Sequence, residues 1–338
     1  EYADHESPAI FVKFEITSDV KLDKKAYVVI WTTTPWTIPA NLAIALNKDF
    51  DYSFYECEGE YILLADGLSE QVSELSQKNL KKVEGSTKKG SELTNLECKH
   101  PWIDRKSIIL LGDHVTLEAG TGAVHTAPGH GPDDYILGLK NDLPAYSPVD
   151  EAGKFTHDVP EFEGENVFKA NPLIVEKLKE SGHLLGHYKL KHSYPHCWRT
   201  KKPLIYRATS QWFLKMDDDT NNLRVKTLEE IKKVKWIPSW GENRINAMIE
   251  NRPDWCLSRQ RLWGVPIPVF KCKSCGEHLI SSAVMNQVAD KMEKEDGINS
   301  YFETEASEFT KGHKCSSCGK EDFDKCKDIL DVWFDSGS

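Results

Sequence analysis

Residues 120–135 gather the glycines and polar side chains that could bind a small ligand. The segment reads Gly-Thr-Gly-Ala-Val-His-Thr-Ala-Pro-Gly-His-Gly-Pro-Asp-Asp-Tyr and includes His125, His130, Asp133 and Asp134. Glycines permit positive φ angles and a close approach of the backbone to a ligand. A loop of this kind presents polar groups from a rigid support, as binding loops do. An ordinary Gly-rich connection with solvated histidines remains an equally simple interpretation.

A second polar stretch follows the apolar, β-branched run over residues 26–31. It contains Thr32, Thr33 and Thr34, whose hydroxyls would alternate between the two faces of a strand end. Two prolines follow closely and stop regular strand pairing. Such a threonine ledge can hydrogen-bond a small polar ligand, although a run of threonines at a sheet edge can also simply pack.

Four of the nine cysteines form two identical Cys-x-x-Cys-Gly knuckles. Paired knuckles match a tetrahedral four-cysteine zinc site, and the glycine permits the turn that directs backbone N–H groups at the sulfurs. We therefore predict one structural zinc ion in a module over about residues 270–330, with four free thiols as the alternative. All ligands would be protein side chains, so this metal has no catalytic role. The predicted ligands are Cys272, Cys275, Cys315 and Cys318.

The composition restricts the possible partners. The chain of 338 residues carries a net charge of -10, which argues against a wholly basic nucleic-acid binder. Residues 187–207 nevertheless combine lysines, arginines and aromatic side chains without any acidic residue, and could contact a phosphate backbone or form a solvated basic face. No apolar run approaches the ~20 residues of a membrane span, and the acidic start shows no targeting signal. We expect a cytoplasmic protein without membrane contact.

The elements that must position these residues follow from periodicity and turn signals. Residues 123–126 are expected to form a strand, followed by a loop and by a helix that opens at Pro132. Asp133 and Asp134 would then lie in the first helical turn, where the helix dipole keeps carboxylates ionised. Many short strands with frequent turns favour a barrel or sandwich. Further strands are expected at residues 8–16, 26–31, 61–64, 108–111 and 115–118, and helices at 68–76, 171–182, 221–234 and 281–297.

Five stretches resemble one family. Residues Trp31–Asn41 resemble the threonine-rich peptide of the editing domain of class I isoleucyl-tRNA synthetases, and Gly120–Tyr135 resemble the second signature of that domain. His192–Arg199, Trp255–Gly264 and Asp331–Ser338 resemble the connecting region of the same family. The related valyl and leucyl enzymes carry Thr-Thr-Arg-Pro where this chain has Thr-Thr-Thr-Pro, which favours the isoleucyl member.

The resemblance implies an α+β fold. It implies a β-barrel-like editing domain with flanking helices, plus a connecting region that carries the zinc-knuckle module. The expected limits are residues 1–15 for a connecting strand region, 16–185 for the editing domain and 186–338 for the connecting base. The chain would be an editing insertion of a longer synthetase and a monomer by itself.

The resemblance also implies an activity, the hydrolysis of valine from mischarged tRNA(Ile). Its partners would be the acceptor end of that tRNA and the remainder of the synthetase. The matched motifs contain no Ser/His/Asp or Cys/His pair, so we expect direct attack by water. A catalytically silent aminoacyl-tRNA-binding module and a zinc-stabilised scaffold are the alternatives. By resemblance, Thr32, Thr33 and Thr34 shape the pocket, Asn41 forms a polar wall, His125 limits side-chain size or orients water, Asp134 binds the substrate amino group, and His130 and Asp133 are structural.

The family's adenylate-forming site uses His-x-Gly-His and Lys-Met-Ser-Lys-Ser motifs, and neither occurs in this sequence. Without a phosphate-cradling loop the chain has nothing to hold ATP. We therefore predict that it cannot form isoleucyl-adenylate. Isoleucine-dependent pyrophosphate exchange by the purified chain tests this, and a rate above background would contradict it.

Overall fold

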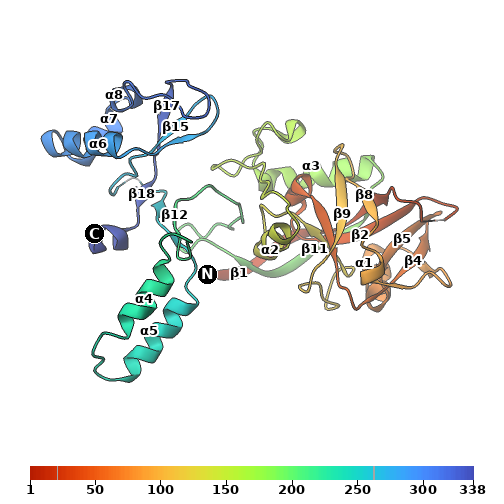
Figure 1. Ribbon diagram of the computed structural model, residues 1–338. Coiled ribbons are helices and arrows are strands. Elements are labelled where there is room, and N and C mark those ends of the chain that lie inside the picture. Colours follow the sequence, from red (N-terminus) through yellow and green to blue (C-terminus); the bar gives the residue numbers. More distant parts are fainter. Residues whose placement is uncertain (21, 262) are drawn as a thin grey trace. The chain divides into compact units, whose positions relative to one another are not determined.

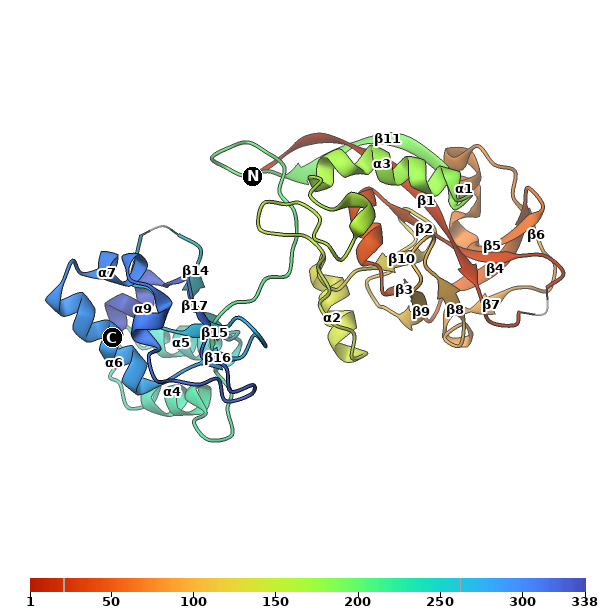
Figure 2. The same cartoon turned by 90° about the horizontal axis from the view of Figure 1, so that it is seen from above.

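The computed structural model describes residues 1–20, 22–261 and 263–338, and the chain divides into two compact units (Figures 1 and 2). The first unit comprises residues 1–208 and the second residues 209–338. The finer domain limits implied by the resemblance remain a prediction. Among the described residues, no helix has the length and apolar character needed to cross a bilayer.

The first unit is built on an 11-stranded mixed sheet around one long strand, β1 (Tyr2–Ile16). β1 pairs antiparallel with β2 (Ala26–Thr32), β8 (Glu97–Lys99) and β11 (Leu184–Pro195). The path through the sheet is β10-β3-β9-β8-β1-β2-β5-β4-β6. The other strands are β3 (Ala43–Leu46), β4 (Asp51–Cys57), β5 (Glu60–Ala65), β6 (Lys81–Lys82), β7 (Lys88–Lys89), β9 (Lys106–Leu111) and β10 (Ala123–Thr126).

The sheet curves back on itself, because β10 at one end of the path also contacts β2. The strands from β10 to β2 thereby enclose a core, and the predicted α+β fold with a barrel-like part is confirmed. Two strand pairs, β2 with β5 and β3 with β9, are parallel, and the other pairs are antiparallel. Fully buried members of the core include Ile10, Val12, Phe14, Val28, Ile30, Ile38, Ile44, Leu46 and Tyr52.

Among the described residues of this unit, three α-helices accompany the sheet: α1 (Ser69–Ser76), α2 (Pro132–Lys140) and α3 (Val167–Glu180). α3 lies along the sheet in both ribbon views (Figures 1 and 2) and buries residues at helical spacing, Val167, Ala170, Ile174 and Leu178. It begins before the predicted start at residue 171, because the Asn166 side chain accepts a hydrogen bond from Phe168 N and caps it. Short 3-10 helices lie at η1 (Pro35–Ala40), η2 (Asp66–Leu68), η3 (Gly90–Glu92) and η4 (Pro160–Phe162).

The strand predicted at residues 115–118 is wrong, since this segment is an irregular loop. Val115 N donates to Gly112 O at 3.3 Å, and this closes a turn directly after β9. Gly112 N donates to Leu46 O, and the Asn47 amide donates to Val115 O at 3.0 Å. Both ends of the turn are therefore tied to β3 and the residue after it.

The second unit contains a helical hairpin and the cysteine module. The hairpin consists of α4 (Leu223–Ile231), which was predicted from the periodicity of residues 221–234, and α5 (Trp240–Glu250). The module pairs β15 (Phe270–Cys272) with β16 (His278–Leu279) and β17 (Phe323–Lys325), and it includes the expected inserted helix α6 (Ser282–Lys294). Smaller elements are β12 (Phe213–Leu214), β13 (Trp255–Cys256), β14 (Ser258–Arg259), α7 (Ile298–Glu303), α8 (Ala306–Phe309), β18 (Ile329–Leu330) and α9 (Val332–Gly337).

Candidate functional site

The threonine ledge lies at the end of β2 and is fixed by local hydrogen bonds. Thr34 N donates to Thr32 Oγ1 at 3.1 Å, and the two hydroxyls are also 3.1 Å apart. The Thr37 hydroxyl, one turn along η1, donates to Thr34 O at 2.8 Å. Thr33 and Thr34 remain partly exposed, so the ledge keeps polar surface for a ligand.

His125 lies on β10, directly behind this ledge, and its ring is almost completely buried with 7% exposure. Asn41 Nδ2, which can only donate, lies 2.9 Å from His125 Nδ1. The proton is therefore on Nε2, which donates to Thr37 Oγ1 at 2.9 Å. Asn41 Oδ1 in turn accepts from Ser107 Oγ at 2.7 Å. Both ring nitrogens thus have protein partners.

The sequence did not single out Thr37 or Ser107, although both belong to this network. Thr37 could have been found from the sequence, because it lies three residues after Thr34. Side chains three residues apart lie on the same side of a 3-10 helix. Ser107 lies on β9, a strand with no motif of its own, and only the fold brings it to Asn41.

We predict that Asn41→Ala destabilises the first unit by at least about 2 kcal/mol, because it leaves both His125 Nδ1 and the Ser107 hydroxyl buried without a partner. Urea unfolding of the purified protein measures this. Asn95→Ala, at an exposed position, is the control and should cost almost nothing. A loss below ~0.5 kcal/mol for Asn41→Ala would contradict the network.

Burial lowers the pKa of His125 to about 3, with a further contribution from His130. The unfolded chain takes up this proton near pH 6.5, whereas the folded chain does not, so stability is lost as the pH falls below 6.5. Between pH 7 and pH 5 the loss attributable to His125 is on the order of 2 kcal/mol. Urea unfolding at both pH values, in the wild type and in His125→Gln, measures it. Equal pH dependence in the two proteins would contradict this prediction.

Asp134 lies in the first turn of α2, where Pro132 provides the predicted N-terminal position. Its Oδ2 accepts a hydrogen bond from Ala127 N at 3.0 Å, two residues after His125. Within the described residues, its Oδ1 has no hydrogen-bond partner and no lysine or arginine pairs with it. One carboxylate oxygen is thus fixed by the backbone of the segment between β10 and α2.

The position of Asp134 in the first helical turn is not the whole of its environment, because its side chain is also largely buried. Burial raises its pKa to about 6, against the lowering effects of the Ala127 N–H and of His114, and Asp133 raises it further. At pH 7 the group is still mainly a carboxylate. Asp133 itself is exposed. His130 donates through Nδ1–H to Tyr206 O at 2.9 Å and packs edge-on against Trp36.

A pocket of about 330 Å³ opens on the ledge. Residues at the end of β2, including Thr32, line it together with Thr33, and the loop before β10 and the start of β10 line the rest. Gly122, with φ +74°, allows close packing here, since a Cβ would lie 2.4 Å from Ala65 Cβ. Thr33 and Thr34 also line a groove of about 460 Å³ with Trp36 and Asn171. The remaining lining residues of the smaller pocket include Trp31, His114, Thr116, Glu118, Gly120, Thr121 and Val124.

The basic segment 187–207 is partly neutralised within its own sheet. Lys189 pairs with Glu6 at 2.8 Å and Lys191 with Asp4 at 3.1 Å, across the β1–β11 ribbon. These pairs are exposed, and exposed ion pairs are worth little, so phosphate groups could compete for the lysines.

The four knuckle cysteines meet in the second unit, and their sulfur atoms all lie within 4.8 Å of one another. Cys272 Sγ is 3.6 Å from Cys318 Sγ, and Cys275 Sγ is 3.4 Å from Cys315 Sγ. The glycines that follow Cys275 and Cys318 have φ of +79° and +71°, as the predicted turns require. Backbone N–H groups directed at the sulfurs lower the pKa of Cys272 to about 7 and also lower the pKa of Cys315. The four residues suit a soft metal ion.

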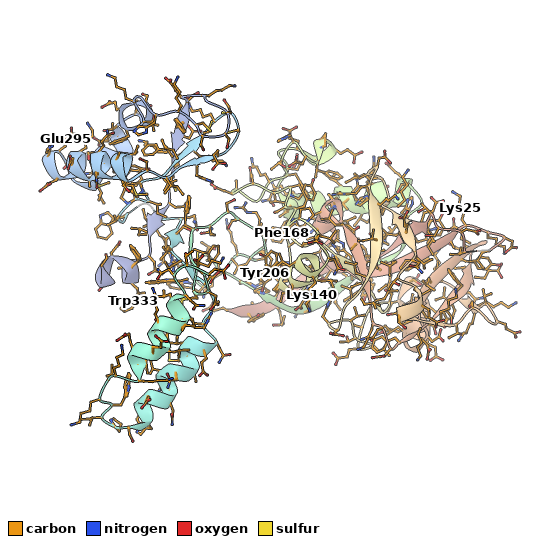
Figure 3. All side chains as sticks on the ribbon, in the orientation of Figure 1. Lys25, Lys140, Phe168, Tyr206, Glu295 and Trp333 are labelled. Carbon is orange, nitrogen blue, oxygen red and sulfur yellow. The ribbon has the colours of Figure 1, made fainter. Side chains whose placement is uncertain are left out.

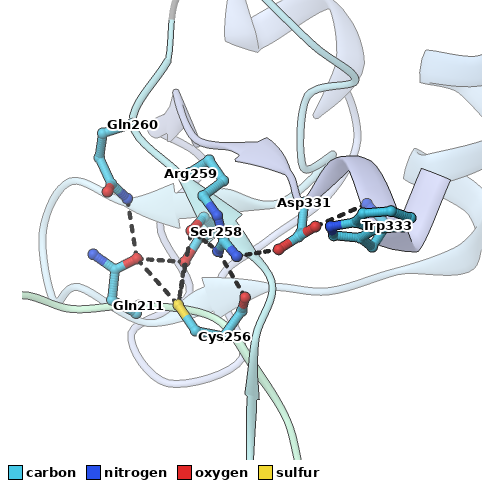
Figure 4. Close-up of polar contacts among 7 residues, drawn as sticks. All are labelled: Gln211, Cys256, Ser258, Arg259, Gln260, Asp331 and Trp333. Carbon is cyan, nitrogen blue, oxygen red and sulfur yellow. Dashed lines mark hydrogen bonds and ion pairs between the residues drawn. The ribbon is translucent and has the colours of Figure 1, made fainter. Parts of the chain in front are cut away.

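A second polar network joins two of the stretches that resemble the synthetase family (Figure 4). β14 pairs with β18, and Arg259 Nη2 forms an ion pair with Asp331 Oδ2. Asp331 Oδ1 accepts from Trp333 N at 2.8 Å and so caps α9. Gln211 Oε1 accepts from Ser258 Oγ at 2.7 Å. Trp333, labelled in Figure 3, is 74% exposed.

Comparisons with known proteins agree with these motifs. A family model described as "tRNA synthetases class I (I, L, M and V)" matches residues 6–338. The chain is 52% identical to "Isoleucine--tRNA ligase" of Persephonella marina, 51% to that of Kosmotoga olearia and 52% to that of Brevibacillus brevis. In each case the whole chain is matched, and it spans 36% of the length of the relative.

A solved structure described as "The crystal structure of GlLeuRS-CP1" is 15% identical to this chain, with a TM-score of 0.41. That likeness covers 52% of this chain and 97% of the other. The family match over residues 6–338 confirms the resemblance drawn from the motifs. The chain therefore belongs to the class I tRNA synthetase family of the I, L, M and V enzymes.

Proposed function

We propose that this chain carries the editing site of an isoleucine–tRNA ligase and hydrolyses the ester of valine on tRNA(Ile). An isoleucine pocket rejects valine poorly, because one methylene is worth only about 1–3 kcal/mol, a limit for which isoleucyl-tRNA synthetases are the usual example. A second site that admits valine and excludes isoleucine corrects the error. The names of the relatives, together with the Thr-Thr-Thr-Pro sequence, support the isoleucyl assignment.

The observation that carries the proposal is the carboxylate of Asp134. It is partly buried, one of its oxygens is tied to Ala127 N, two residues after His125, and the other is free of partners within the described residues. A partly dry carboxylate without a cationic partner is suited to a ligand's ammonium group. The substrate's α-ammonium group supplies that charge.

In the proposed reaction a water oxygen attacks the ester carbonyl carbon. The bond from that carbon to the ribose oxygen breaks, and the products are valine and a tRNA with a free hydroxyl. The ledge hydroxyls of Thr32, Thr33 and Thr34 orient the water and the ester. Neutral His125, together with Asn41, holds Thr37 and so supports the ledge from behind, which also limits the depth of the pocket. The ester beside an ammonium group is already activated, so no protein nucleophile is needed.

The four-cysteine cluster is proposed to hold one zinc ion, with Cys272, Cys275, Cys315 and Cys318 as its ligands. The metal would stabilise the module and take no part in hydrolysis. The remainder of the synthetase is proposed as the partner that presents the tRNA acceptor end.

A deacylation assay decides between the proposed function and its alternatives. Purified chain is incubated with preformed Val-tRNA(Ile) and, separately, with Ile-tRNA(Ile). We expect valine to be released well above the rate without protein, and isoleucine to be released more slowly. Binding of both aminoacyl-tRNAs without release would support the silent binding module. Neither binding nor release would support the scaffold.

A further inference from the structure

The hydrogen bonds behind the threonine ledge have a direction, because each hydroxyl carries one proton and that proton can be assigned. The side-chain amide of Asn41 is the starting point. Its Nδ2 lies 2.8 Å from Ala43 O, which can only accept, so this atom is the nitrogen and not the oxygen of the amide. The same nitrogen donates to His125 Nδ1, and the amide oxygen accepts from Ser107 Oγ. Asn41 therefore fixes the proton of His125 on Nε2.

The direction continues from His125 into the ledge. Thr37 Oγ1 accepts from His125 Nε2 at 2.9 Å and donates its own proton to Thr34 O at 2.8 Å. The Thr34 hydroxyl lies 3.4 Å from Thr37 Oγ1, so the proton in that contact comes from Thr34. Thr32 Oγ1 accepts from Thr34 N and lies 3.1 Å from Thr34 Oγ1, so its proton is directed at Thr34. Both hydroxyls thus direct their protons into the protein.

Thr33 differs from its two neighbours. Its hydroxyl has no hydrogen-bond partner within residues 1–20, 22–261 and 263–338. Thr33 also lines both the pocket of about 330 Å³ and the groove of about 460 Å³. Its hydroxyl can therefore rotate and donate to a ligand. Thr34, which is partly exposed and lines the groove, offers a ligand only its lone pairs.

We propose that Asn41 is a positioning residue that sets this direction, so that Thr32 and Thr34 accept hydrogen bonds from a ligand, whereas Thr33 is the ledge residue that donates to one. This inference rests on the proposed function for the identity of the ligand. A carbonyl oxygen can only accept, so the ester carbonyl oxygen binds at Thr33. Negative charge develops on that oxygen as water attacks, and a donor directed at it stabilises the transition state. Groups that carry a proton, the attacking water among them, bind at Thr34.

Burial keeps this direction fixed. Asn41 and Ser107 are fully buried and His125 is almost so, which shields their hydrogen bonds from competing water. Burial also lowers the pKa of His125 to about 3, so at pH 7 the ring is neutral and its Nδ1 can accept. A reversed amide would turn the Asn41 oxygen toward Ala43 O, and two acceptors would then face each other without a proton between them.

Two measurements on the wild-type chain test the direction without any assay of activity. The nitrogen-15 NMR spectrum of the histidines distinguishes a protonated from an unprotonated ring nitrogen, and His125→Gln assigns the signals of His125. We expect an unprotonated Nδ1 and a protonated Nε2 at neutral pH. Neutron diffraction from crystals of the deuterated protein should place the Thr34 deuteron toward Thr37 Oγ1 and the Thr37 deuteron toward Thr34 O.

Asn41→Asp tests the source of the direction. A carboxylate cannot donate, so His125 Nδ1 should gain a proton in this variant. Ser107→Ala is the matched control, because it removes a hydrogen bond from the same amide but leaves Nδ2 as a donor, and Nδ1 should stay unprotonated. A protonated Nδ1 in the wild type, or a Thr34 deuteron directed away from Thr37, would overturn the inference. These wild-type results decide the matter even if Asn41→Asp does not fold.

The threonines should also differ in their kinetics. Thr33→Val removes the donor to the ester and should lower kcat for Val-tRNA(Ile) by at least about tenfold, with a smaller change in KM, because the charge develops only in the transition state. Thr33→Ser keeps the hydroxyl and should retain most of the rate. Thr34→Val removes an acceptor and should lower kcat less than Thr33→Val does. Thr94→Val, at an exposed position, is the control and should leave kcat and KM unchanged.

A larger loss of kcat in Thr34→Val than in Thr33→Val would also overturn the inference. If the wild-type chain shows the expected proton positions but does not hydrolyse Val-tRNA(Ile), the proposed function is overturned, while the direction set by Asn41 stands. The two failures are therefore distinguishable.

Discussion

Removal of zinc is expected to unfold the cysteine module, about residues 270–330, while the first unit stays folded. Cys272 and Cys315 are part of the module's buried core, beside Phe270 and Tyr301, so the ligands and the core depend on each other. Structural zinc binding is worth about 10–16 kcal/mol in small domains, which is as large as the whole stability of a typical domain. The first unit has its own core and should not respond.

Metal analysis of protein purified without chelator should give about one zinc per chain. Hydrogen exchange, followed segment by segment before and after chelation, should show protection lost in the module and kept in residues 1–208. Cys315→Ser should abolish zinc binding. Cys326→Ser is the matched control, because Cys326 lies in the same module but outside the four-sulfur cluster, and it should retain the metal. Four freely titrating thiols in a native, metal-free protein would refute the site.

Local signals were sufficient for the elements that carry the motifs. β10 has the predicted limits, 123–126, and α2 begins at Pro132, because proline is favoured in the first turn of a helix. The knuckle cysteines were equally predictable, since each pair and its glycine form one turn. The prediction of a strand at residues 115–118 failed because a turn takes the place of strand pairing there. This turn is held by hydrogen bonds to Leu46 and Asn47, which are distant in sequence.

The environment of the site residues could not be predicted in the same way. The ring of His125 contacts Thr37 in η1 and Asn41, which directly follows η1. Asn41 in turn accepts a hydrogen bond from Ser107 on β9. No pattern within one segment indicates that both ring nitrogens would be occupied. For Asp134 the sequence indicated the helix dipole, which favours the ionised form, but burial, which raises the pKa, is a tertiary effect that no local pattern indicates. Residue types were thus predictable, whereas their pKa values depended on the fold.

Asp134→Asn is expected to lower kcat/KM for Val-tRNA(Ile) by at least about tenfold. The substitution removes the charge that would pair with the substrate ammonium group, and a charge-assisted hydrogen bond is worth roughly 1.5–3 kcal/mol. About 1.4 kcal/mol corresponds to one decade in rate. The asparagine amide oxygen can still accept from Ala127 N, so the start of α2 should stay intact. Asp134→Ala would lose this bond as well and would mix a structural effect with the chemical one.

Asp133→Asn is the matched control, because it makes the same change of charge in the same helical turn at an exposed position. It should alter the rate by less than about twofold, since an exposed charge near the site is screened by solvent. The wild-type rate should also fall as the pH drops below about 6, where Asp134 takes up a proton, and Asp134→Asn should lack this acidic limb. An unchanged rate for folded Asp134→Asn would mean that residues 120–135 are structural and that the editing assignment is wrong.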